Sequence, residues 1–111
     1  MEELAKEINE KMTRICIEYL FLKQTDVITK VLPLTEDIQS FLNVFLQGNV
    51  FGIEEEDYEQ LLSYAFRVAE DYVEAISQKD AVLMIDTLDY GLRELLNIYL
   101  APVEDKDGRN I

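Results

Sequence analysis

The fold is decided by residues 61–100, which read LLSYAFRVAEDYVEAISQKDAVLMIDTLDYGLRELLNIYL. Apolar residues recur every three or four positions on both sides of the polar run Ser77-Gln78-Lys79, and this spacing predicts two amphipathic helices. Asp80 follows the run as the expected N-cap of the second helix. Because the connection is so short, the two helices are expected to pack as an antiparallel hairpin. Gly91 falls on the inner face, where it permits a close approach of the helices.

Each helix of this hairpin has a predicted buried stripe. The stripe of the first helix, which begins with the acidic run 54–57, consists of Tyr58, Leu61, Leu62, Ala65, Ala69, Tyr72, Val73 and Ile76. The stripe of the second helix consists of Ile85, Leu88, Gly91, Leu92, Leu95 and Tyr99.

The two segments that precede the hairpin show the same helical spacing. The first predicted stripe consists of Leu4, Ile8, Met12, Ile15, Tyr19 and Leu22. The second follows the candidate caps Thr25 and Asp26 and consists of Val27, Val31, Leu34, Ile38, Phe41, Leu42 and Phe45. Pro33 interrupts this segment, so residues 25–47 form either one kinked helix, which the unbroken phase of the stripe favours, or two helices with a restart at Thr35. Gly48 is the expected left-handed cap.

These segments predict an all-α fold: an up-down antiparallel helical bundle of three to four helices, with a kink or break at Pro33. Strand-like alternation does not persist anywhere in the sequence. We expect residues 1–101 to form a single bundle domain and residues 102–111 to form a flexible polar tail.

The composition narrows the classes of function. Of the 111 residues, 23 are Asp or Glu and 10 are Lys or Arg, for a formal net charge of -13. Histidine is absent, which removes the commonest general base and the usual nitrogen ligand of zinc. The single cysteine, Cys16, cannot form an intramolecular disulfide and is expected to be a buried small hydrophobe. We predict no catalytic residue, metal site or cofactor, and a cytoplasmic location.

The negative charge is concentrated in the second half of the chain. Residues 52–111 contain 15 acidic and 5 basic side chains, whereas residues 1–51 contain 8 and 5. Such a field repels nucleic-acid phosphates and anionic lipid, so direct nucleic-acid or membrane binding is not expected. A basic or amphipathic-helical protein, or a second copy of the chain as a homodimer, is the expected partner.

Several carboxylates have a spacing known from enzymes. Glu55, Glu56 and Glu59, with Asp86 and Asp89 farther on, resemble the EExxE … ExxD layout of helical nucleotide pyrophosphohydrolases of the MazG type. The resemblance implies Mg²⁺ bound by acidic side chains. However, the second motif has Asp86 where that family has Glu, and Glu56 and Asp86 are predicted to face solvent.

The hairpin itself carries a second resemblance. Residues 61–100, with the turn Gln78-Lys79-Asp80 and the flanking Leu and Tyr stripe, resemble hairpins of small acidic flagellar export chaperones. They are also similar to acidic helical proteins of Gram-positive bacteria whose function is not characterised. The first resemblance implies a protein that wraps an aggregation-prone helical segment of a client.

Apolar residues outside the stripes indicate a partner surface. Ile17, Leu20 and Phe21 form one outward group, and Leu83 and Tyr90 form another. Exposed apolar patches usually mark interaction sites; alternatively, the bundle buries both faces of the first helix.

Three functions follow from these observations. The first is a non-catalytic protein-protein interaction module, an adaptor or chaperone-like protein, that uses Ile17, Leu20, Phe21, Leu83 and Tyr90. The second is an acidic inhibitor that mimics nucleic acid, and the third is an Mg-dependent phosphohydrolase. The acidic face proposed for the inhibitor consists of Glu54, Glu55, Glu56, Asp57, Glu59, Glu70, Asp71 and Glu74.

Overall fold

The computed structural model describes residues 1–49 and 51–100. The predicted polar tail over 102–111 therefore lies outside the described residues. The helical elements, in chain order, are α1 (Glu2–Leu22), α2 (Val27–Val31), the 3₁₀-helix η1 (Leu32–Leu34), α3 (Thr35–Leu46), α4 (Glu55–Gln78), α5 (Ala81–Asp86), the π-helix η2 (Thr87–Leu92) and α6 (Arg93–Leu100).

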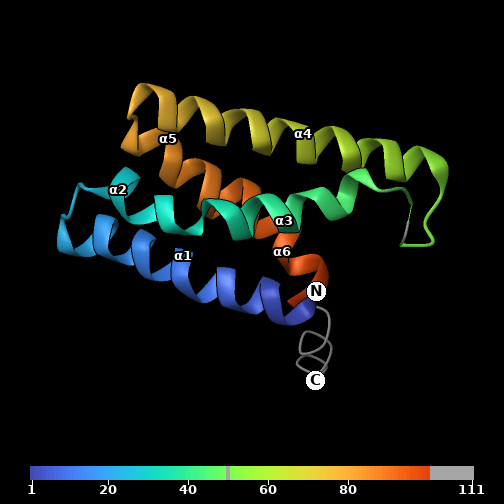
Figure 1. Cartoon of the computed structure of the whole chain (residues 1–111), viewed down its shortest axis with the longest axis horizontal. Coiled ribbons are helices and arrows are strands. Elements are labelled where there is room, and N and C mark those ends of the chain that lie inside the picture. The colour runs from blue at the N-terminus through green and yellow to red at the C-terminus, as the bar shows by residue number, and fades with distance from the viewer. Residues whose placement is uncertain (50, 101–111) are drawn as a thin grey trace, which may run out of the picture.

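The elements form four successive helical segments that alternate in direction, which confirms the predicted all-α bundle (Figure 1). The segment α2–η1–α3 lies between α1 and α4 and contacts both of them. The segment α5–η2–α6 lies behind these three in Figure 1 and contacts α1, α2 and α4. The molecule measures 39 × 35 × 20 Å, and its smallest dimension corresponds to two layers of helices about 10 Å thick each.

At Pro33, where the sequence predicts a kink or a break, the structure has a short stretch of 3₁₀-helix. α2 ends at Val31, and α3 begins at Thr35. Leu32 and Leu34 keep right-handed helical dihedral angles, so the chain continues in nearly the same direction. Pro33 is exposed, whereas Val31 and Leu34 on either side are buried. The proline therefore costs hydrogen bonds on the solvent side and leaves the buried stripe intact.

The fourth segment differs from the regular helix that its spacing predicts. Asp80 caps it as expected, because its Oδ1 accepts a hydrogen bond from the backbone N–H of Leu83 at 3.0 Å. From Thr87 to Leu92, however, the helix widens to a π-helix. Gly91 lies in this part, and a Cβ atom there would lie 3.0 Å from Cγ2 of Val68. The predicted close approach at Gly91 is confirmed.

The core confirms most of the predicted stripes and corrects parts of others. All seven residues of the stripe in the second segment are buried, and so is Cys16. Val73 was predicted to be buried but is 65% exposed, because the inner face of α4 is centred instead on Val68, Tyr72 and Ala75. Leu22, the last residue of α1, is likewise exposed.

The predicted caps were less accurate. Asp26 occupies the N-cap position of α2 but makes no capping hydrogen bond; its carboxylate lies 3.4 Å from Nζ of Lys30. Left-handed caps end α1 and α4 at Lys23 and Lys79. Gly48 lies one residue beyond the C-cap of α3 and has a φ of +131°, outside the left-handed helical region, so it is not the cap expected there.

Helices long and apolar enough to cross a bilayer are not found among residues 1–49 and 51–100.

Candidate docking groove

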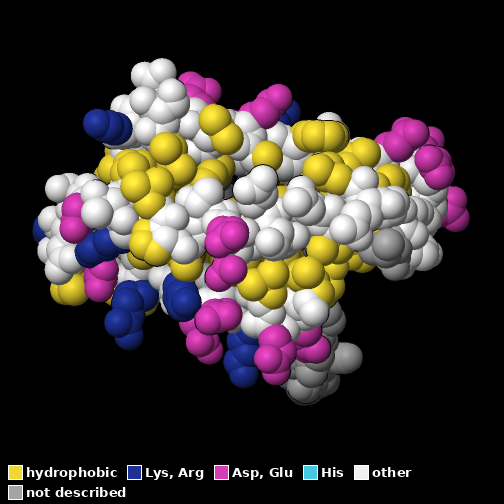
Figure 2. All heavy atoms as spheres, viewed as in Figure 1, with side chains coloured by type: hydrophobic (Ala, Val, Ile, Leu, Met, Phe, Trp, Pro, Cys, Tyr) yellow, Lys and Arg dark blue, Asp and Glu magenta, His cyan; other side chains and the backbone are white. Residues whose placement is uncertain are grey.

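An apolar groove of ≈ 500 Å³ runs between α3 and α4. Its floor includes Ile38, Leu42 and Tyr72, all of which are buried. Leu46 from α3 and Phe66 from α4 are 46% and 51% exposed and line its walls together with Val73. Figure 2 shows hydrophobic side chains along this junction of α3 and α4. The groove presents apolar surface to solvent that the bundle itself does not cover.

The groove exists because α4 presents small residues toward α3. Ala65 is buried and Ala69 is half-buried, and both line the groove. A larger side chain at either position would occupy the space between the two helices. Phe66 and Val73, seven residues apart on α4, lie on the outer side of this alanine pair and remain exposed.

One polar contact crosses the floor of the groove. Oγ1 of Thr35 and the hydroxyl oxygen of Tyr72 are 2.7 Å apart and share a hydrogen bond. Burial raises the pKa of Tyr72 above its ordinary value, and the hydrogen bond with Thr35 acts in the opposite direction. The tyrosine is therefore neutral at physiological pH and part of the packing between α3 and α4.

The edge of the groove formed by α4 is acidic. Glu70 and Glu74 line a shallow outer hollow that shares Phe66, Ala69, Val73 and Ser77 with the groove. Both glutamates are exposed. Neither lining contains a lysine or an arginine among the residues that the structure describes. The groove is thus apolar in its centre and negatively charged at this edge.

The acidic face predicted from the sequence is divided in the structure. Glu54, Glu55, Glu56, Asp57 and Glu59 are all exposed at the start of α4, and Figure 2 shows acidic side chains at this end of the molecule. Asp57 and Glu70 are separated by about 20 Å along the helix, at 1.5 Å per residue. Asp71 is half-buried and lines a different hollow, next to Arg67.

The two predicted apolar groups lie in different places. Ile17, Leu20 and Phe21 are 47%, 47% and 73% exposed on the last turns of α1. The alternative that both faces of this helix are buried is therefore wrong for its C-terminal end. Leu83 and Tyr90 line a hollow of ≈ 170 Å³ between α4 and α5–η2, where the hydroxyl of Tyr64 donates a hydrogen bond to the Tyr90 carbonyl oxygen at 3.2 Å.

Within this second group the two side chains differ. Tyr90 is 69% exposed, as expected for an outward residue. Leu83 is only partly exposed and packs against the core, so it faces outward less than the sequence predicts. The physical reason is its place at the first turn of α5, where α4 lies beside it.

The walls of the α3–α4 groove were missed by the sequence analysis. The spacing of the α4 stripe predicts a buried Val73, and it predicts no surface that includes Leu46 or Phe66. The available signal was the spacing of Phe66 and Val73, which places two large apolar residues on one face beside a pair of alanines.

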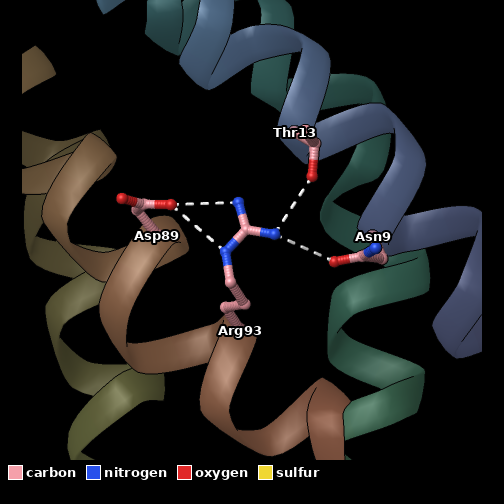
Figure 3. A network of polar contacts seen from close by, with 4 residues as sticks. All are labelled: Asn9, Thr13, Asp89 and Arg93. Atoms are coloured by element: carbon pink, nitrogen blue, oxygen red, sulfur yellow. Dashed lines mark hydrogen bonds and ion pairs between the residues drawn. The ribbon is translucent and has the colours of Figure 1, made fainter. Parts of the chain in front are cut away.

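The carboxylates with enzyme-like spacing are used differently in the structure. Oδ1 of Asp89 accepts hydrogen bonds from Nε and Nη2 of Arg93 at 3.2 and 3.0 Å. Nη1 of the same arginine donates to Asn9 and Thr13 of α1, as Figure 3 shows. This network joins α1 to the η2–α6 junction. Asp86 is exposed.

Within the described residues, no three His, Cys, Asp or Glu side chains are placed to hold a metal ion.

Comparisons with protein-family models, with curated proteins and with solved structures find no match to this chain.

Proposed function

We propose that this chain is a non-catalytic protein-binding module, an adaptor or chaperone-like protein, and that the α3–α4 groove is its docking surface. The observation that supports this is the exposure of Leu46, Phe66 and Val73 around one apolar hollow. Apolar surface gathered in this way usually marks a contact with another molecule.

The driving force for docking is the burial of these walls. Covering three apolar side chains that are about half exposed contributes roughly 2–4 kcal/mol. The remaining affinity would come from the flanks of the partner and from the apolar floor of the groove. A client-binding role is also what the resemblance of the hairpin to flagellar export chaperones implies.

The proposal is tested by site-specific photo-crosslinking in cells of the source organism. A photoreactive phenylalanine analogue is placed at Val73, in the groove, or at Val82 of α5, which is 59% exposed and does not line the groove. We expect one adduct with a different protein from position 73 and none from position 82. Leu46→Glu in the same chain is expected to abolish the adduct.

Mass spectrometry then identifies the partner, and the complex is reassembled from the two purified proteins. Equal adducts from both positions, or no adduct from position 73, would contradict the proposal. An adduct of twice the mass of the chain would mean that a second copy covers the groove, and would also contradict it.

A further inference from the structure

We infer that the occupant of the groove is an amphipathic helix of about three turns, with lysine or arginine on the flanks of its apolar stripe. This inference rests on the proposed docking function and adds the chemistry of the partner. Three observations support it: the length of the groove, the absence of hydrogen-bonding backbone along it, and the sign of the charges at its edge.

The first observation is the length. The groove extends from Thr35 to Leu46 along α3, a distance of about 17 Å at 1.5 Å per residue. About three turns of helix fit this distance, which corresponds to apolar residues at positions i, i+4 and i+7 of the partner. Small residues between two neighbouring helices leave a groove into which a third helix can pack.

The second observation concerns backbone hydrogen bonds. The groove is formed by the side chains of two helices, whose backbone groups are bonded within each helix. An extended segment placed there would leave its own N–H and C=O groups without partners against an apolar surface. A helix satisfies these groups internally, so the geometry favours a helical occupant over a strand.

The third observation is charge. Glu70 and Glu74 flank the groove on α4. Glu36, the residue after the lining residue Thr35, is exposed on α3. Basic residues on the flanks of the occupant would meet these carboxylates, and the net charge of -13 would steer such a helix toward the protein. A second copy of the chain would bring its own net charge of -13 to this acidic edge, which opposes self-association at the groove.

The test uses three labelled peptides of about 14 residues and fluorescence anisotropy. The first has a leucine stripe with lysine flanks, the second has the same stripe with glutamine flanks, and the third is the first in scrambled order. We expect the lysine-flanked peptide to bind about tenfold more tightly than the glutamine-flanked one at low salt, with the difference lost at high salt. The scrambled peptide is expected to bind weakly.

Protein variants locate the binding. Val73→Lys is expected to weaken both striped peptides at least about tenfold. The double variant Glu70→Gln with Glu74→Gln is expected to remove most of the preference for lysine flanks. The matched control, Glu55→Gln with Glu56→Gln, removes the same charge from the far end of α4 and is expected to keep that preference.

The outcomes separate this inference from the proposed function. Equal binding of the two striped peptides, lost in Val73→Lys, would overturn the inference about charge and support the groove as the docking surface. Absence of peptide binding together with a groove-specific crosslink at position 73 would overturn the helical occupant alone. Binding of the scrambled peptide as tight as that of the ordered one, unchanged in Val73→Lys, would contradict the groove as the site and the inference with it.

Discussion

The hydroxyl groups of Thr35 and Tyr72 lie 2.7 Å apart and tie α3 to α4 across the floor of the apolar groove. Tyr72 is buried, so Thr35 provides a hydrogen bond where water has little access. The contact joins the two helices whose outer faces form the groove walls. It connects the packing of the bundle directly to the shape of the proposed docking surface.

We expect Thr35→Val and Tyr72→Phe each to lower the free energy of unfolding by about 1 kcal/mol. Each substitution removes one of the two hydroxyl groups and leaves the other without this hydrogen bond. The double variant is expected to lose less than the sum of the two single losses, since both changes remove the same bond. Denaturant unfolding of the four proteins measures this. Strictly additive losses would show that the bond does not contribute to stability.

Gly91→Ala tests the close contact between η2 and α4. The added methyl group would lie 3.0 Å from Cγ2 of Val68, whose side chain is buried and has little room to move. The destabilisation from overpacking, about 1–3 kcal/mol, is expected to outweigh the stabilisation of about 1 kcal/mol from the higher helix propensity of alanine. We therefore expect a net loss of about 1 kcal/mol in thermal or denaturant unfolding. Combining it with Val68→Ala is expected to cost less than the two changes separately; a stabilised Gly91→Ala protein would contradict this account.

Arg93→Met tests the network that joins α1 to the last segment. The substitution keeps a long apolar side chain but removes the hydrogen bonds to Asn9, Thr13 and Asp89. Because these groups are only partly buried, we expect a loss of about 1–2 kcal/mol in the free energy of unfolding. Arg93→Lys keeps the positive charge but lacks the planar guanidinium group. Its free energy of unfolding is expected to lie between those of Arg93→Met and the unchanged protein. Equal stability of all three would show that the network contributes nothing.

We predict that the stability of the protein depends on pH through the Cys16 thiol. Burial, with a smaller contribution from the Asp89 charge, raises the pKa of this thiol from 9.0 to about 11. The folded protein holds the proton more tightly than the unfolded chain. The protonated thiol therefore contributes its full stabilisation of the folded state below about pH 9. As the pH rises from 9 to 11 this contribution is lost, and the free energy of unfolding falls by about 2–3 kcal/mol.

Cys16→Ala serves as the control for this prediction, because it lacks the titrating group and retains the tyrosines. We expect its free energy of unfolding to fall less steeply between pH 9 and pH 11 than that of the unchanged protein. Parallel curves in urea unfolding series would contradict the assignment to Cys16.

Phe21→Glu and Leu83→Glu compare two residues that the sequence placed on one partner surface. Phe21 is 73% exposed, so a glutamate there is expected to change stability by less than about 0.5 kcal/mol. Leu83 packs against the core, and a glutamate there is expected to cost about 1–3 kcal/mol. Circular dichroism during thermal unfolding distinguishes the two. Loss of the folded state in Phe21→Glu would show that the end of α1 is covered.

Apolar spacing predicts burial correctly in one segment and less well in another, for a physical reason. All seven stripe residues from Val27 to Phe45 are buried, because this segment packs between α1 and α4 and every residue on its stripe meets a neighbour. Val73 belongs to an equally regular pattern but lies where α3 and α4 diverge around small residues. The pattern is the same in both segments, and only the neighbours differ.

The sequence by itself determined that the chain is helical, where its segments begin, that Asp80 caps the last of them and that Gly91 meets a neighbouring helix. These features depend on the 3.6-residue period and on local hydrogen bonds, which are properties of a short stretch of chain. Only the tertiary structure decided that Leu46, Phe66 and Val73 surround an open groove, that Leu83 is partly buried and that the acidic face is divided. Exposure depends on which distant segments pack against a residue, and no local spacing contains that information.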